Sequence, residues 1–160
     1  MKTRKSWKEK LEDSKDLPKV VKIPERMKAK WGKGTLVIPA PKDVDEMMRR
    51  VPKRKVTTIK HIRTALATKH STTMACPLTT GIFAWIAANA AEEAVAAGPR
   101  ARITPYWRTL KAGGVLNEKY PGGIDRQKQQ LEAEGHTVVK QGKHHVVVDH
   151  EKKLFDFNVE

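Results

Sequence analysis

The stretch TTIKHIRTALATKHSTTMACPLTTGIFAWIAANAAEEAVAAG, residues 57–98, decides the fold because its pattern predicts two helices joined by a short connector. The first half, up to His70, has apolar residues at the three- and four-residue spacing of one helical face: Ile59, Ile62 and Leu66. A threonine pair stands just before them, and threonine is a favoured N-cap residue. We therefore expect a helix of about three turns, capped by Thr57 or Thr58.

The second half of this stretch predicts a longer helix. Pro77 suits a first helical position, Gly98 suits a helix end, and alanine fills the interval between them. Two helices joined this way form a helix-turn-helix candidate, in which the start of the second helix approaches the bases of DNA. An ordinary helical hairpin is the alternative. On the first interpretation the residues nearest the bases are Thr79, Thr80 and Gly81.

The C-terminal part predicts one more helix and a small sheet. Residues 124–135 form a helix candidate stopped by Gly135. Alternating apolar residues around KQGK predict a hairpin of 137–139 with 145–148, and residues 154–157 are a candidate extra strand. The fold class expected is α+β, mainly α: a winged-helix-like helix-turn-helix domain with a small C-terminal antiparallel sheet.

Residues 1–50 are expected to form a basic N-terminal arm with short elements, and residues 51–160 the compact domain. The arm has four prolines and only short apolar runs, which favours a solvated tail over a dedicated contact with nucleic acid or a partner. TLVIP, at 35–39, predicts one strand. DVDEMMRRVP predicts a helix capped by Asp43, with an acidic first turn and a basic last turn.

Charge indicates the class of partner. The net charge is +14 and the isoelectric point is near 10.0. Residues 1–60 hold 19 Lys and Arg against 8 Asp and Glu, a net of +11, whereas residues 61–160 hold 13 against 10, a net of +3. A strongly basic chain attracts polyanions and releases their counterions, so nucleic acid is the leading partner.

Three further patterns lie between residues 105 and 135: PYWR begins at Pro105, YPGG begins at Tyr120, and a helix candidate follows that ends in Glu134 and Gly135. From Val51 to His136 the chain resembles the DNA-binding domain of methylated-DNA–protein-cysteine methyltransferases. Proteins of that family carry a helix-turn-helix, a Pro-Cys-His-Arg motif, Tyr-x-Gly-Gly and a helix ending in Glu-Gly. The resemblance implies a DNA-binding fold.

The departures from the family pattern concern its chemistry. Tyr106 stands at the position of the acceptor cysteine and Trp107 at that of the base histidine. Alkyl transfer requires a thiolate activated by a base, and neither a phenol nor an indole replaces that pair. Ile59 replaces a tyrosine that helps to rotate the target phosphate, and Gly81 or Ile82 replaces the arginine that fills the gap left by a flipped base. The chain is therefore expected to be no enzyme, like the alkyltransferase-like members that lack the cysteine.

The function predicted is non-enzymatic DNA binding, with a link to alkylation damage recognition or DNA repair. The alternative is a protein-interaction module on the same fold that no longer binds DNA. By resemblance Arg108 is largely structural, and the glutamate at position 134 orients the family's histidine. Because Trp107 replaces that histidine, our hypothesis is that Glu134 accepts a hydrogen bond from the Trp107 indole or from Arg108 instead. The residues expected to contact DNA are Thr57, Thr58, Thr79, Thr80, Gly81, Tyr106, Trp107, Arg108, Tyr120, Gly122 and Gly123.

Other candidate sites are weaker. Cys76 precedes a helix start, where a thiol pKa falls, but a small buried cysteine is the commoner outcome. His144 and His145 are adjacent in a predicted strand and face opposite sides, which disfavours a shared metal. No cofactor is implied, and a small-molecule substrate is not expected. With one cysteine and no apolar run long enough for a membrane span, a cytoplasmic protein is expected.

Overall fold

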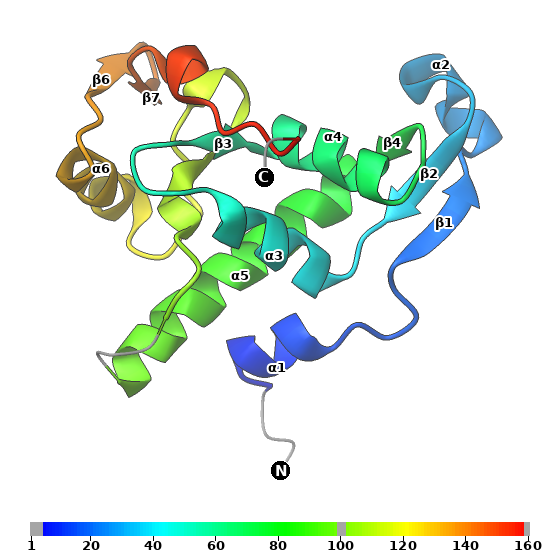
Figure 1. The fold of residues 1–160 in the computed structure, drawn as a ribbon, viewed down its shortest axis with the longest axis horizontal. Helices are drawn as coiled ribbons and strands as arrows, with labels where there is room; N and C mark the ends of the chain where they lie inside the picture. Colours follow the sequence, from blue (N-terminus) through cyan, green and yellow to red (C-terminus); the bar gives the residue numbers. More distant parts are fainter. Residues whose placement is uncertain (1–4, 99–101, 159–160) are drawn as a thin grey trace.

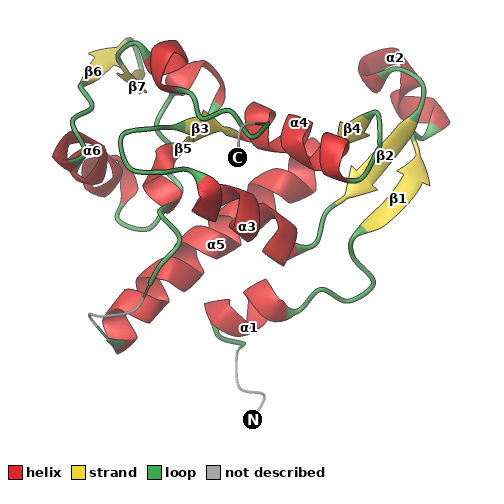
Figure 2. Ribbon diagram, in the orientation of Figure 1, coloured by secondary structure: helices red, strands yellow, loops and turns green. Residues whose placement is uncertain are grey.

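The computed structural model describes residues 5–98 and 102–158, and it is mainly helical with three small sheets (Figures 1 and 2). Its α-helices are α1 (Trp7–Glu12), α2 (Lys28–Trp31), α3 (Pro41–Arg50), α4 (Ile59–Lys69), α5 (Pro77–Ala97) and α6 (Gly123–Ala133). Its strands are β1 (Lys19–Lys22), β2 (Thr35–Ile38), β3 (Thr57–Thr58), β4 (Met74–Ala75), β5 (Thr109–Leu110), β6 (Val138–Gln141) and β7 (His144–Val147). Short 3-10 helices are η1 (Glu25–Met27), η2 (Tyr106–Arg108), η3 (Ala112–Gly114) and η4 (His150–Lys153).

The long helix α5 forms the centre of the molecule, and α1, α3 and α4 pack around it (Figure 1). Its start at Pro77 and its end before Gly98 agree with the prediction. The buried residues of α5 are Thr80 and five alanines: Ala84, Ala87, Ala88, Ala90 and Ala91. Small side chains allow neighbouring helices to approach closely, so the core is completed by larger residues of those neighbours, namely Val44, Met48, Ile62 and Leu66.

The helix-turn-helix prediction agrees with the order and lengths of α4 and α5. The hydroxyl of Thr58 accepts a hydrogen bond from the backbone N–H of His61 at 3.3 Å and so caps α4. The connector contains β4, which pairs parallel with β2 and places the start of α5 against that strand. The mainly α, α+β fold class is confirmed. None of the helices that the structure describes is long and apolar enough to cross a membrane.

The elements before residue 51 belong to the same core as the rest, which corrects the expectation of a solvated arm. Of the strands in this region the sequence predicted only β2. In the structure β1 pairs antiparallel with β2, and β2 pairs with β4, which makes a three-stranded sheet. Helix α1 lies along α5, where its first backbone N–H groups donate to the Glu93 carboxylate. The apolar side chains that this segment buries in the core are Leu11, Val37, Val44, Met47 and Met48.

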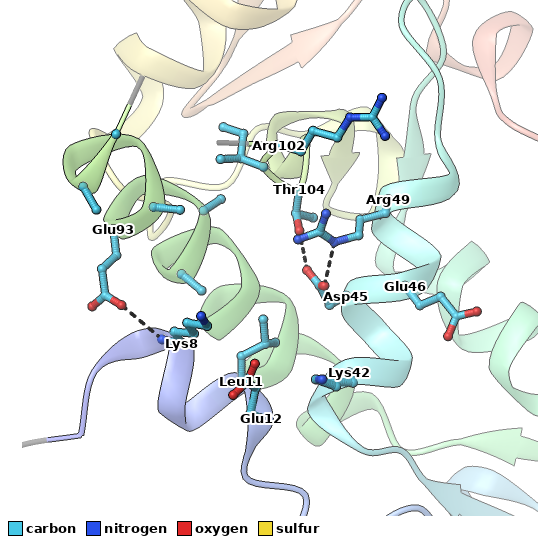
Figure 3. Close-up of a pocket in the computed structure, with 16 residues that line it drawn as sticks. Lys8, Leu11, Glu12, Lys42, Asp45, Glu46, Arg49, Glu93, Arg102 and Thr104 are labelled. Carbon is cyan, nitrogen blue, oxygen red and sulfur yellow. Dashed lines mark hydrogen bonds and ion pairs between the residues drawn. The ribbon is translucent and has the colours of Figure 1, made fainter. Parts of the chain in front are cut away.

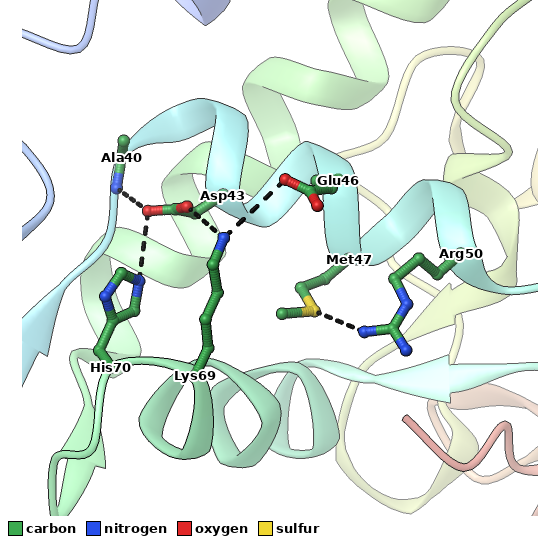
Figure 4. A network of polar contacts seen from close by, with 7 residues as sticks. All are labelled: Ala40, Asp43, Glu46, Met47, Arg50, Lys69 and His70. Carbon is green, nitrogen blue, oxygen red and sulfur yellow. Dashed lines mark hydrogen bonds and ion pairs between the residues drawn. The ribbon is translucent and has the colours of Figure 1, made fainter. Parts of the chain in front are cut away.

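A polar network joins the start of α3 to the end of α4 (Figure 4). Asp43 was expected to be the N-cap of this helix. Instead α3 begins at Pro41 with Ala40 as its N-cap, and the Asp43 carboxylate accepts a hydrogen bond from the backbone N–H of Ala40 at 3.1 Å. The earlier start follows from Pro41, which suits the first helical turn. The Lys69 ammonium donates to the Asp43 carboxylate at 3.0 Å, and Nε2 of His70 lies 3.6 Å from the same carboxylate.

A second, smaller core lies under the C-terminal part and contains Val56, Leu110, Leu116, Leu131, Val138 and Val147. The predicted hairpin is present as β6 and β7, which pair antiparallel with Val138 opposite Val147. The predicted strand at 154–157 does not extend this hairpin. Leu154 instead forms an isolated parallel bridge with Val56, because η4 turns the chain away from β7.

Candidate nucleic-acid interface

The first half of α5 presents an apolar face to solvent. Leu78 is 70% exposed, Ile82 43% and Trp85 38%, and their spacing of four and three residues places them on one side of the helix. Residues Thr79 and Gly81 lie beside them and are half-buried. Sequence reasoning missed this face, although its helical spacing is visible in the sequence. The reason is that alanine, not the larger residues, faces the core.

The Tyr-x-Gly-Gly loop lies next to this face. The indole N–H of Trp85 donates to the backbone carbonyl of Lys119 at 3.1 Å, which ties the loop to α5. Trp7 packs edge-on against Trp85, with ring centroids 4.8 Å apart. Gly122 is the N-cap of α6 and has φ of +82°, and a Cβ there would come within 2.6 Å of Arg126. The glycine is therefore required by both the turn and the close approach of α6.

The Tyr106 side chain is fully buried where the resemblance places a reactive cysteine. Its hydroxyl donates to the Glu92 carboxylate of α5 at 2.6 Å, and its ring packs edge-on against Trp107 and Tyr120 with centroid separations of 5.4 and 5.3 Å. Burial and the Glu92 carboxylate raise the pKa of the Tyr106 phenol well above its ordinary value. The phenol therefore stays protonated and is no nucleophile at neutral pH.

Arg108 forms a buried ion pair with Glu134. Its guanidinium donates to both carboxylate oxygens, with the shortest contact at 2.6 Å, and also donates to the backbone carbonyl of Val51 at 2.8 Å. This agrees with the expected structural role of Arg108 and with one of the two donors proposed for Glu134. The other donor, the Trp107 indole N–H, is buried with no hydrogen-bond partner among the described residues.

Five of the residues expected to contact DNA are buried, which corrects the expectation of direct contact for them in this conformation: Thr57, Thr58, Thr80, Tyr106 and Tyr120. Several of their hydroxyl groups form hydrogen bonds within the protein. The hydroxyl of Thr80 donates to the Cys76 carbonyl at 2.7 Å, and that of Tyr120 donates to the Thr109 carbonyl at 3.2 Å.

The remaining six predicted residues are less buried and fall into two groups. Arg108 and Trp107 are half-buried and held by the contacts described above. Thr79 and Gly81 on α5, with Gly122 and Gly123 in the loop, lie on the two elements that the Trp85 hydrogen bond joins. The structure therefore brings together part of the predicted set and adds Leu78, Ile82 and Trp85 to it.

Cys76 is half-buried at the N-cap of α5. Lys69 and His70, which lie near Cys76 in sequence, are turned toward Asp43 (Figure 4). No group of three or more histidine, cysteine, aspartate or glutamate side chains is placed to hold a metal ion within residues 5–98 and 102–158.

A cleft of about 1030 Å³ lies between α1, α3 and the end of α5 (Figure 3). Its floor is formed by alanines of α5, and charged side chains surround it. Asp45 accepts from Arg49 at 2.9 Å and from the Thr104 hydroxyl, while Glu93 accepts from the backbone at the start of α1. Glu93 thus joins α5 to α1, and Asp45 joins α3 to the segment at Thr104.

Comparison with known proteins shows a shared fold. No protein-family model matches the sequence, and no curated protein matches it. The chain shares its fold with S. pombe Atl1. The TM-score is 0.52 at 16% sequence identity, over 72% of this chain and 94% of Atl1, and that crystal structure holds Atl1 in complex with damaged DNA containing O6-carboxymethylguanine. A second structure, of S. pombe ATL in complex with DNA, gives the same values.

Proposed function

We propose that this protein binds DNA through α4, the start of α5 and the Tyr-x-Gly-Gly loop, and that it transfers no alkyl group. The observation that supports this most directly is the solvent-exposed first half of α5, the second helix of a helix-turn-helix, in a fold shared with S. pombe Atl1. The helix start is the part that enters a DNA groove in helix-turn-helix proteins.

Loss of the transfer chemistry is supported by the position of Tyr106. A protonated phenol, hydrogen-bonded to Glu92 in the interior, is no acceptor for an alkyl group. A protein of this kind recognises a lesion and leaves it unchanged, which is compatible with a role in alkylation damage recognition or DNA repair.

Electrostatics supports a phosphate backbone as the ligand. Lys60 at the start of α4 and Lys119 in the loop that contacts Trp85 are exposed, and we assign them to phosphate contacts. The large net positive charge adds a non-specific attraction that falls steeply with salt. The apolar residues Leu78, Ile82 and Trp85 supply contact with sugars and bases, or a wedge between base steps as in other minor-groove binders.

A second candidate function is docking of a protein partner on the same apolar face. The observation that favours it is the absence of a charged side chain among the three most exposed residues of this half of α5, Leu78, Ile82 and Trp85. A partner protein is recognised by such a face through desolvation of large apolar groups. DNA remains the first candidate because the fold and the net charge both favour it.

A binding titration tests the proposal. We expect the double variant Leu78→Ala/Ile82→Ala to bind a plain duplex, and a duplex with one O6-methylguanine, at least about tenfold more weakly than the wild type. The matched control is Val20→Ala/Val139→Ala, which trims two exposed valines elsewhere and should bind like the wild type. If the two double variants bind each duplex with the same affinity, at both of two salt concentrations, the result favours the protein partner.

A further inference from the structure

A separate pocket of about 480 Å³ lies where the turn at residues 52–55 meets the end of α6 and η4. Its walls include three cationic side chains, Lys53, Arg54 and Lys153, together with the imidazole of His136. None of these residues belongs to α4, α5 or the Tyr-x-Gly-Gly loop. The pocket is therefore a feature distinct from the DNA-contacting surface proposed above.

The backbone holds the cationic residues together although they are distant in sequence. The backbone N–H of Val56 donates to the Lys153 carbonyl at 2.9 Å, and that of Phe155 donates to the Val56 carbonyl at 2.8 Å. A turn closed by Lys55 N–H donating to the Pro52 carbonyl at 3.1 Å presents the two residues between them. These contacts bring the turn that carries Lys53 and Arg54 next to the segment that carries Lys153, and all three residues line the pocket.

The charge in this pocket is not neutralised by the protein itself. Within residues 5–98 and 102–158, no carboxylate forms an ion pair with Lys53, Arg54 or Lys153. Of the two glutamates that line the pocket, Glu134 is engaged by Arg108, which leaves Glu132 as the only lining carboxylate without an ion pair in that part of the chain. The excess of positive charge favours an anion.

His136 provides a second, independent observation. Its side chain is only 4% exposed, and neither ring nitrogen has a hydrogen-bond partner among the described residues. Burial, and then the neighbouring Lys153 ammonium, lower the pKa of the imidazole, so the ring is neutral near pH 7 and carries one N–H donor. A buried donor with no acceptor is destabilising, which indicates that a ligand or a bound water supplies the acceptor.

We propose that this pocket binds a phosphate group, with Lys53, Arg54 and Lys153 supplying charge and His136 donating a hydrogen bond. A guanidinium suits phosphate because it donates two parallel hydrogen bonds, and the ammonium groups add charge at the remaining oxygens. The phosphate belongs either to a free phosphorylated molecule or to the backbone of a nucleic acid. This site stands independently of the proposed function, since its residues lie on other elements.

Titration of the full chain with inorganic phosphate, at constant ionic strength against chloride, tests the site. The readout is the nuclear magnetic resonance signal of the His136 ring and of the Gly135 amide. We expect saturable shifts, and at least tenfold weaker binding in Lys53→Ala/Arg54→Ala. The matched control, Lys30→Ala/Lys33→Ala, removes the same charge from exposed positions elsewhere and should bind phosphate like the wild type.

Two more probes separate the sources of phosphate. If the Lys53→Ala/Arg54→Ala pair also loses more duplex DNA affinity than the control pair, the ligand is the nucleic-acid backbone. If duplex affinity is equal in the two pairs while ribose 5-phosphate binding is lost only in the first, the ligand is a free phosphorylated molecule. The proposal is overturned if phosphate shifts neither signal, or if both pairs weaken phosphate binding equally.

A second variant, His136→Gln, tests the hydrogen bond separately from the charge. Because His136 is buried, its folding is checked by circular dichroism before titration. We expect several-fold weaker phosphate binding in the folded variant, read from the Gly135 amide. Unchanged binding would remove His136 from the site.

Discussion

The hydroxyl of Tyr106 donates a 2.6 Å hydrogen bond to Glu92, and the same carboxylate accepts two hydrogen bonds from Arg126 at 3.1 and 3.2 Å. One carboxylate of α5 thus joins η2 to α6. The position that carries a reactive thiol in the methyltransferases that this chain resembles is here part of the structural framework.

Replacing Tyr106 by phenylalanine removes one of the donors to Glu92 while Arg126 stays in place. We expect a loss of about 1.5 to 3 kcal/mol in the free energy of unfolding, since hydrogen bonds to charged groups contribute roughly that much. Urea denaturation measures it. DNA affinity should not change, because the phenol is buried; a large fall in affinity at unchanged stability would show that the phenol contacts DNA.

Restoring only the thiol should not restore transfer. In Tyr106→Cys the residue that follows is still Trp107, which is no base, so the thiol is not activated. Incubation with duplex DNA carrying O6-methylguanine, followed by mass spectrometry of the intact protein, should show no methyl adduct. Stoichiometric methylation of the variant would contradict the proposal that the residue at position 107 prevents transfer.

Breaking the Arg108–Glu134 pair should be costly. The two side chains are 13% and 7% exposed, and Arg108→Ala leaves a buried carboxylate with no partner, which costs about 3 to 5 kcal/mol. The matched control is Lys111→Ala, which breaks the exposed pair with Glu118 and should cost less than about 1 kcal/mol. Chemical denaturation of both variants decides this; similar losses would mean that the buried pair adds little.

An arginine at position 81 should strengthen DNA binding. A Cβ built at Gly81 meets no atom within 4 Å, so a side chain there is tolerated, and replacing an interior helical glycine also favours the helix by up to about 1 kcal/mol. We expect Gly81→Arg to bind duplexes more tightly than Gln129→Arg, which adds the same charge at an exposed position of α6. Equal gains in DNA affinity for the two variants would indicate that the added charge acts without regard to its position.

Stability should fall as pH drops below about 6.5. Burial lowers the pKa of both His61 and His136, while in the unfolded chain they titrate near the ordinary value of 6.5. The unfolded state therefore takes up protons first, and the stabilisation present above pH 6.5 is lost as pH falls toward the folded pKa. Urea unfolding at pH 7.5 and 5.5 tests this, with His136→Gln expected to show a smaller difference between the two.

The elements whose signals are local could be predicted from the sequence. Thr58 caps α4, Pro77 begins α5, and the hairpin forms around Gly142, because caps, prolines and turns act through their immediate neighbours. The mainly α fold class followed from these elements and from the motifs after Pro105.

Only the tertiary structure decided which face of α5 is buried and what the first fifty residues do. Helix α5 is apolar on more than one side, and small alanines face inward because α1, α3 and α4 fill the remaining space, which leaves Leu78, Ile82 and Trp85 outside. Short apolar runs such as those around Leu11 and Val37 carry no strong period, so their burial depends on contacts with distant elements. Tyr106 donates a hydrogen bond to Glu92, which is 14 residues away in the chain and on another element, and no local pattern specifies that pair.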